Sequence, residues 1–154
     1  MDLAIRKASE KDLGVLHEFE QGVVDAERPF DSTLREDLIH YYNLPELINS
    51  PTTQLLVAEV EGKIIACGYA RIDQSKDYLV HSHHAYFGFM YVVPEMRGRG
   101  INKKIIEQLK IWAHSQEINE IRLEVYIKNS SAIRAYEKLG FQQHLLEMRM
   151  NLND

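Results

Sequence analysis

The segment Val92–Lys104 constrains the fold of this chain most, because it joins two different hydrophobic patterns through a glycine-rich turn. The residues before it, Tyr86–Val93, form an apolar and aromatic run of the kind expected in a buried strand. The turn itself contains Gly98 and Gly100. Beyond the turn, apolar residues recur at helical spacing, at Ile101, Ile105, Ile106, Leu109 and Trp112. The sequence therefore predicts a strand, a break at the proline, a tight turn and a helix.

The turn has the properties of a phosphate-binding site. Glycine permits a tight bend and the close approach of a ligand. The first N–H groups of a helix lack internal partners and lie at the positive end of its dipole. Basic side chains crowd the same turn, although the net charge of the whole chain is −5: Arg97, Arg99, Lys103 and Lys104. The dinucleotide-binding and P-loop glycine patterns are both absent, so the phosphate carrier should be of another kind.

Two motifs of this chain resemble those of the GNAT superfamily of acyl-CoA N-acyltransferases. Val92-x-Pro94-x-x-Arg97-Gly98-x-Gly100 is similar to the coenzyme A motif of that family. A second motif follows Leu123-Glu124-Val125 and reads Asn129-x-x-Ala132-x-x-x-Tyr136-Glu137-Lys138-Leu139-Gly140-Phe141. Two motifs in order are more specific than either alone. The family length is also similar, so the resemblance predicts a single N-acetyltransferase domain over residues 1–154.

The hydrophobic patterns and turn signals predict an α/β domain with a mixed sheet. In the family that the chain resembles, the sheet is mostly antiparallel and flanked by helices, and two parallel strands splay apart where coenzyme A binds. The strand before the glycine turn and a strand at 120–126 should form this pair, joined by a right-handed crossover. We also expect a helix at 33–40 and a closing strand at 145–152.

Composition limits the class of protein further. A chain of 154 residues is one domain by the usual size prior. The single cysteine, Cys67, lies in an apolar run and is expected to be a core residue rather than a nucleophile. No membrane-length apolar run or signal-peptide pattern is visible, so a cytoplasmic protein without a membrane partner is expected. The acidic net charge argues against nucleic acid as a partner.

The resemblance implies that acetyl-CoA is the co-substrate. Backbone groups of the strand before the turn would pair with the pantetheine arm and the thioester carbonyl, and a donor there would act like an oxyanion hole. The turn and helix start would hold the pyrophosphate. The implied coenzyme-binding residues are Met90, Tyr91, Val92, Arg97, Gly98, Arg99, Gly100, Ile101, Asn102, Lys103 and Asn129. Asn102 departs from the family, which usually has glycine or alanine there; its amide could cap the helix or donate to phosphate.

Acetyl transfer to an amine also requires a proton donor and a proton acceptor. Tyr136 matches the position of the family's general acid, which would protonate the departing thiolate. Glu124 is similar in position to the base of ribosomal-protein N-terminal acetyltransferases, and it could act directly or through water. A salt-bridged or solvent-facing role for Glu124 is the structural alternative. Glu27 is a second candidate for the base.

Three histidines, His81, His83 and His84, have a spacing that occurs at metal sites. No acidic or cysteine ligand stands at a supportive spacing, so no metal is expected and these residues are predicted to lie at a strand edge or loop.

Three functions remain open at this point. The first is an enzyme that moves an acetyl group from acetyl-CoA to a primary amine. The second is a non-catalytic acyl-CoA-binding or sensing domain, which would keep the Arg97–Gly100 turn but lose the acid. The presence of Tyr136 and Glu124 favours the enzyme. The third is an enzyme that modifies a protein N-terminus or lysine. The acceptor should bind near Val24–Asn49 and Asp73–His84, where the family varies. Homodimers are common in the family, and no residue pattern here selects one.

Overall fold

A computed structural model describes residues 2–154, which form two compact units that meet in the sequence at Glu124 and Val125. Each unit is described by itself. The first contains three helices and five strands: β1 (Leu3–Lys7), α1 (Leu13–Glu27), α2 (Leu44–Asn49), β2 (Thr53–Val60), β3 (Lys63–Gln74), β4 (His83–Val92), α3 (Ile101–Ser115) and β5 (Ile121–Arg122). Short 3₁₀ turns occupy Glu10–Asp12, Arg28–Phe30 and Pro94–Met96. The second unit contains α4 (Ser130–Lys138).

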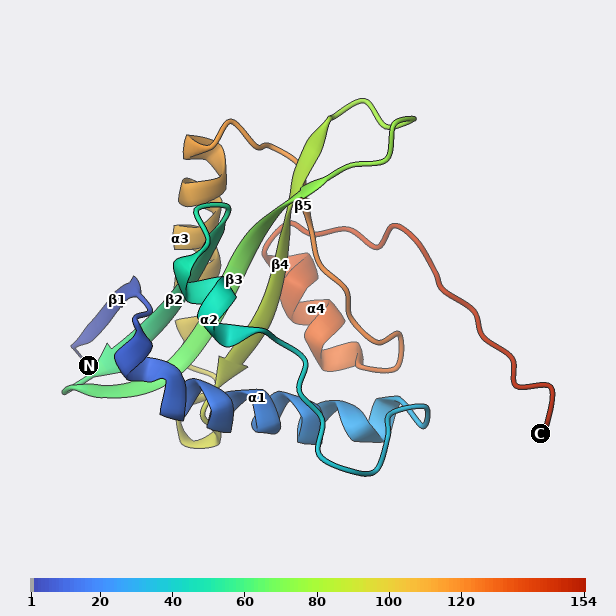
Figure 1. The fold of residues 1–154 in the computed structure, drawn as a ribbon, viewed down its shortest axis with the longest axis horizontal. Helices are drawn as coiled ribbons and strands as arrows, with labels where there is room; N and C mark the ends of the chain where they lie inside the picture. The colour runs from blue at the N-terminus through green and yellow to red at the C-terminus, as the bar shows by residue number, and fades with distance from the viewer. Residues whose placement is uncertain (1) are drawn as a thin grey trace. The chain divides into compact units, whose positions relative to one another are not determined.

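The five strands form one sheet in the order β1-β2-β3-β4-β5 (Figure 1). The first three pairings are antiparallel and the last, between β4 and β5, is parallel. The parallel pairing comprises only Ala85 with Ile121 and Tyr86 with Arg122, although β4 continues to Val92. The predicted mixed, mostly antiparallel sheet with one parallel pair is therefore confirmed.

Helices cover the sheet on both faces. Helices α1 and α2 lie over one face, with Leu16 and Phe19 of α1 in a core cluster that also contains Val57 and Tyr69 of the sheet. Helix α3 covers the opposite face (Figure 1). A side chain at Gly68 of β3 would approach Ile105 of α3 at 3.0 Å, so a small residue is needed where this helix packs closely. The helix at 100–115 was thus predicted correctly, and its apolar side chains are buried.

A charged network fixes the start of α1. Arg6 of β1 donates hydrogen bonds to both oxygens of Asp12, at 2.8 and 3.0 Å, and a further one to Glu59 of β2 at 2.6 Å. The Asp12 carboxylate also accepts from the backbone N–H of Ser9 at 2.8 Å. The Arg6 guanidinium holds the pKa of the buried Asp12 below its usual range. The network thereby ties the helix start to the sheet edge.

The prediction of a helix at 33–40 is wrong. Residues 31–43 form turns and irregular structure between α1 and α2. Side chains supply partners for this backbone: Arg28 donates to the carbonyl of Arg35 at 2.7 Å and to that of Asp37 at 3.2 Å. Leu38, which a helix would need to bury, is 66% exposed. These tertiary bonds outweigh the weak helical pattern of a short segment.

Two predicted strands are also shorter than expected or absent. The strand at 120–126 is reduced to β5, which covers only Ile121–Arg122. The segment 145–152 contains no strand, and its apolar side chains are exposed. Its alternating pattern suits a strand, but a strand requires a paired neighbour, and residues 125–154 by themselves contain none.

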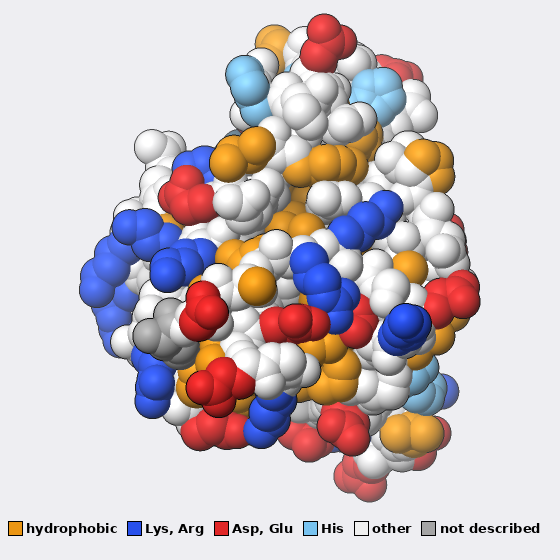
Figure 2. Space-filling model, turned by 90° about the vertical axis from the view of Figure 1, so that its left-hand side faces the viewer, with side chains coloured by type: hydrophobic (Ala, Val, Ile, Leu, Met, Phe, Trp, Pro, Cys, Tyr) orange, Lys and Arg blue, Asp and Glu red, His pale blue; other side chains and the backbone are white. Residues whose placement is uncertain are grey.

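The surface shown in Figure 2 carries Lys and Arg side chains among Asp and Glu side chains over much of its area. Nucleic-acid-binding domains typically gather basic residues on one face.

Across residues 2–154, none of the helices combines the length and the hydropathy needed to cross a membrane.

Candidate active site

The glycine turn leads into α3 with the backbone geometry that the sequence predicted. Gly98 and Gly100 have φ angles of 77° and 75°, in the left-handed region that side chains disfavour, and Gly100 is the N-cap of the helix. A Cβ atom at either glycine would meet nothing within 4 Å, so the turn is open on that side. Helix geometry leaves the first N–H groups of α3 without intrahelical partners. The turn therefore has the open backbone geometry that binding of an anion at a helix start requires.

Arg97 is directed back toward β4. Its Nε donates to the carbonyl oxygen of Val92 at 2.8 Å, and its guanidinium lies 5.6 Å from the ring centroid of Tyr91. The arginine thus connects the end of the strand with the turn. Arg99, Lys103 and Lys104 are exposed around the same turn and add positive charge.

Asn102, the departure from the family pattern, has a buried side-chain oxygen without a hydrogen-bond partner. It lies in the first turn of α3, beside the unpaired N–H groups. A buried polar atom without a partner costs free energy unless a ligand or water satisfies its group. The unpaired Oδ1 needs an N–H or O–H donor, whereas the side-chain NH2 of Asn102 is the group that could donate to an anion at this turn.

Strand β4 is irregular just before the turn. Cys67 of β3 pairs with Tyr91 and Tyr69 pairs with Gly88, so Phe89 and Met90 both stand opposite Gly68. Phe89 has a φ angle of 55°, which is unusual for a residue with a side chain. Such a bulge redirects the backbone groups of a strand. It lies at Met90, in the part of β4 beyond the pairing with β5, where the sequence analysis placed the coenzyme's arm.

A cluster of aromatic rings lies on the α1 side of β3 and β4. We call Tyr42, Tyr69, Tyr86 and Phe89 the tyrosine cluster. Tyr42 stacks on Phe89 with 4.4 Å between ring centroids, and its ring meets Tyr69 edge-on at 5.9 Å. The ring centroids of Tyr69 and Tyr86 are 6.4 Å apart. Arg71, paired with Asp73 at 2.7 Å, lies 4.9 Å from the Tyr86 centroid.

Glu124 is held at the edge of this cluster. Its Oε1 accepts a hydrogen bond from the Tyr86 hydroxyl at 3.0 Å, and the carboxylate is exposed. Burial, together with the negative charge of Glu124, raises the pKa of Tyr86. Arg122 pairs with Glu120, at 3.1 Å. The carboxylate of Glu124 therefore has a hydroxyl partner and access to solvent, as a base acting directly or through water would need.

Glu27, the second candidate for the base, is at the end of α1. Burial raises the pKa of Glu27, whereas the neighbouring Tyr41 hydroxyl acts more weakly in the opposite direction. Burial is the largest cause of the raised pKa of Tyr42, and the negative charge of Glu27 is a smaller one. Glu124 thus contacts the tyrosine cluster, and the charge of Glu27 acts on Tyr42 of the same cluster. Sequence spacing gave no signal for the cluster, because its rings come from segments far apart in the chain.

The remaining predicted residues belong to the second unit. Asn129 is the N-cap of α4 and its Oδ1 accepts from the backbone N–H of Ala132 at 3.3 Å. Tyr136 lies in the same helix, and its ring meets Phe141 edge-on at 5.8 Å. The expected stop at Gly140 is present, with a φ angle of 103°.

The three histidines near the end of β3 are engaged with hydroxyls. His81 and His84 both contact the Ser75 Oγ through Nδ1, at 2.8 Å each, and His83 contacts Ser82 at 2.9 Å. Burial lowers the pKa of His84. They lie at a strand end and loop, as predicted. A different group, His17 with Glu20 and His40, brings three potential ligand atoms within 4.8 Å of one another, and sequence spacing gave no signal for it.

Solved structures share this fold over nearly their whole length. A predicted acetyltransferase with acetyl-CoA, from Clostridium acetobutylicum, is 20% identical with a TM-score of 0.76, covering 99% of this chain and 97% of that one. Glucosamine-6-phosphate N-acetyltransferase from Arabidopsis thaliana is 20% identical with a TM-score of 0.69, covering 99% of both chains. An aminoglycoside antibiotic 6′-N-acetyltransferase from Acinetobacter baumannii is 21% identical with a TM-score of 0.74, covering 98% of this chain and 99% of that one.

The fold is thus that of the N-acetyltransferases. The model of the acetyltransferase (GNAT) family matches residues 17–141, which is most of the chain. The protein belongs to this family, and the resemblance drawn from the two sequence motifs is confirmed.

Proposed function

We propose that this protein is an N-acetyltransferase that moves an acetyl group from acetyl-CoA to a primary amine. The observation that carries the proposal is the open glycine turn at the start of α3, next to the bulged end of β4. Gly98, Gly100 and the first N–H groups of α3 would bind the pyrophosphate, and Asn102 would add its amide. Backbone groups of Met90, Tyr91 and Val92 would receive the pantetheine arm and polarise the thioester carbonyl.

The reaction proceeds by direct attack. The amine nitrogen forms a bond to the acetyl carbon, and the bond between that carbon and sulfur breaks. A protonated amine loses two protons in all: one to the base before the attack, and one as the amide forms. The thiolate of coenzyme A gains one proton from an acid, and the other is released to water. We assign the acid to Tyr136, because it occupies the family's acid position. Family position favours Glu124 as the base, and the raised pKa of Glu27 makes it the competing candidate.

The tyrosine cluster supports an amine acceptor. Its rings already have a cation beside them, since the Arg71 guanidinium lies over Tyr69 and Tyr86. The exposed carboxylate of Glu124 supplies negative charge at the edge of the cluster. An amine arrives mostly protonated at neutral pH, since the pKa of an alkylamine is about 10. A cationic acceptor would therefore be bound before the base removes its proton.

The proposal is tested by measuring thiol release from acetyl-CoA with a panel of amines and peptides. We expect release to depend on at least one amine in the panel and the acetylated product to appear in equal amount. Release with peptides alone would identify a protein-modifying enzyme. Tight acetyl-CoA binding with no acetylated product from any acceptor would contradict the enzyme proposal and support an acyl-CoA-sensing domain.

The base is identified by the pH dependence of two variants. A base is active only when ionised, so kcat/KM should fall as the pH drops through the pKa of the true base. We expect Glu124→Gln to lower kcat/KM near neutral pH and to recover at high pH, where the free amine needs no base. Glu27→Gln is the matched control, with the same loss of charge beside the same cluster. If Glu27→Gln shows this profile and Glu124→Gln follows wild type, the assignment to Glu124 is wrong.

A further inference from the structure

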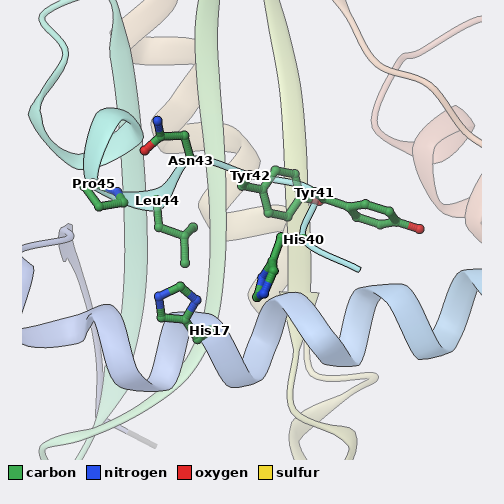
Figure 3. Close-up of a pocket in the computed structure, with 7 residues that line it drawn as sticks. All are labelled: His17, His40, Tyr41, Tyr42, Asn43, Leu44 and Pro45. Carbon is green, nitrogen blue, oxygen red and sulfur yellow. The ribbon is translucent and has the colours of Figure 1, made fainter. Parts of the chain in front are cut away.

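A cluster of two histidines and a glutamate involves none of the residues assigned to coenzyme binding or proton transfer. His17 and Glu20 are one turn apart on α1, and His40 comes from the irregular segment between α1 and α2. In Figure 3, His17 projects from α1 and the ring of His40 points back toward the same helix. One ligand atom from each of the three side chains lies within 4.8 Å of the other two.

The distances suit a tetrahedral ion. The His40 Nδ1 is 2.9 Å and the His17 Nδ1 is 3.9 Å from the Glu20 Oε1. Zinc bonds of about 2.0–2.1 Å with tetrahedral angles separate two ligand atoms by about 3.3 Å. The two observed separations bracket this value. Both histidine side chains are more than half exposed, at 53% and 57%, so small rotations into the coordinating geometry meet little resistance.

The Glu20 carboxylate is held in position by the protein before any ion binds. The Glu20 side chain is completely buried, and its Oε2 accepts hydrogen bonds from the backbone N–H groups of Tyr41 and Tyr42, each at 2.9 Å. The other oxygen, Oε1, is directed to the two imidazoles. Ligating carboxylates are commonly held by outer hydrogen bonds of this kind, which orient the ligand atom and preserve its charge.

An open pocket beside the cluster gives access to an ion. The pocket has a volume of about 570 Å³ and is lined by residues that include His17, His40 and Asn43 (Figure 3). The two imidazoles line it, whereas the buried Glu20 does not. An ion entering from the pocket could keep a water molecule as its fourth ligand, as zinc sites with three protein ligands do.

We propose that His17, Glu20 and His40 bind one Zn²⁺ ion, with water in the fourth position. Imidazole and carboxylate ligands suit zinc and are typical of its three-ligand sites. The ion would replace the hydrogen bond between His40 and Glu20 with two coordinate bonds. It would join the irregular segment to α1 and so restrain the backbone at Tyr41 and Tyr42, which the same carboxylate already holds.

The test uses the full chain without an affinity tag, stripped with a chelator and desalted. Titration with Co²⁺ is followed by visible absorption, Zn²⁺ is then added in competition, and bound zinc is counted by elemental analysis. We expect one zinc per chain, a tetrahedral cobalt spectrum that zinc abolishes, and a rise in Tm with zinc by mass action. His17→Gln and His40→Gln should each weaken zinc binding at least ~10-fold, since loss of even an outer partner costs that much.

His81→Gln is the matched control, because it removes an imidazole from the other histidine group and should leave zinc affinity unchanged. Circular dichroism of each variant checks that the fold is kept. Absence of saturable zinc binding to wild type at micromolar concentration overturns the proposal. Equal affinity in wild type, His17→Gln and His40→Gln overturns it as well, as does weaker binding in His81→Gln alone.

Discussion

Replacing Gly100 with glutamate is expected to weaken acetyl-CoA binding by ~100-fold, which corresponds to about 3 kcal/mol. Two effects act together. The φ angle of 75° at this position disfavours any side chain, and the new carboxylate would stand among the N–H groups that are proposed to hold the pyrophosphate. Isothermal titration calorimetry with acetyl-CoA measures the loss directly.

Gly62→Glu is a close control for this experiment. Gly62 has a φ angle of 78° and open space around its missing side chain, and it lies in the turn between β2 and β3. This variant carries the same strain and the same added charge away from the proposed site. We expect it to lose stability to a similar extent and to keep wild-type affinity. Equal affinity of Gly100→Glu and Gly62→Glu would move the coenzyme site away from the turn.

Tyr136→Phe is expected to lower turnover by ~10²-fold or more with little change in the dissociation constant of acetyl-CoA. The variant keeps the ring, and with it the edge-on contact with Phe141, but it removes the hydroxyl proton. Steady-state kinetics with an accepted amine and calorimetry with acetyl-CoA give the two quantities to compare.

A purely structural role for Tyr136 predicts a different pair of values. Loss of one hydrogen bond would lower the free energy of unfolding by about 1 kcal/mol and leave turnover nearly intact. Thermal unfolding of Tyr136→Phe and wild type, measured beside turnover, separates the two roles. Full activity of Tyr136→Phe would remove the assignment of the acid, while the family membership would stand.

The sequence predicted best those elements whose pattern is local. The helix after Gly100 has both a strong apolar repeat and a glycine start, and it appears as expected in α3. The segment 33–40 failed because its conformation depends on partners elsewhere, above all on Arg28. The segment 145–152 has a strand's alternation, but pairing is a property of two segments and cannot be read from one.

The candidate site divides along the same line. The glycine turn is a continuous stretch, so Gly98 and Gly100 could be assigned from their order in the chain. The tyrosine cluster brings together Tyr42 and Tyr86, which no spacing rule connects. The burial that raises the pKa of Glu27 and the contact between Glu124 and Tyr86 are equally tertiary. Chemistry that needs neighbours from distant segments became visible only in the folded chain.

The buried position of Cys67 gives the protein an internal reporter. Its thiol is inaccessible, its Sγ–H donates to the carbonyl oxygen of Phe89 at 3.4 Å, and burial raises the pKa of the Cys67 thiol. Disulfide reagents react with thiolates, so the native protein should contribute no background when they detect released coenzyme A. Slow labelling of Cys67 would instead record each opening of the sheet beside the bulge in β4. One reagent could therefore follow both catalysis and local unfolding of the core.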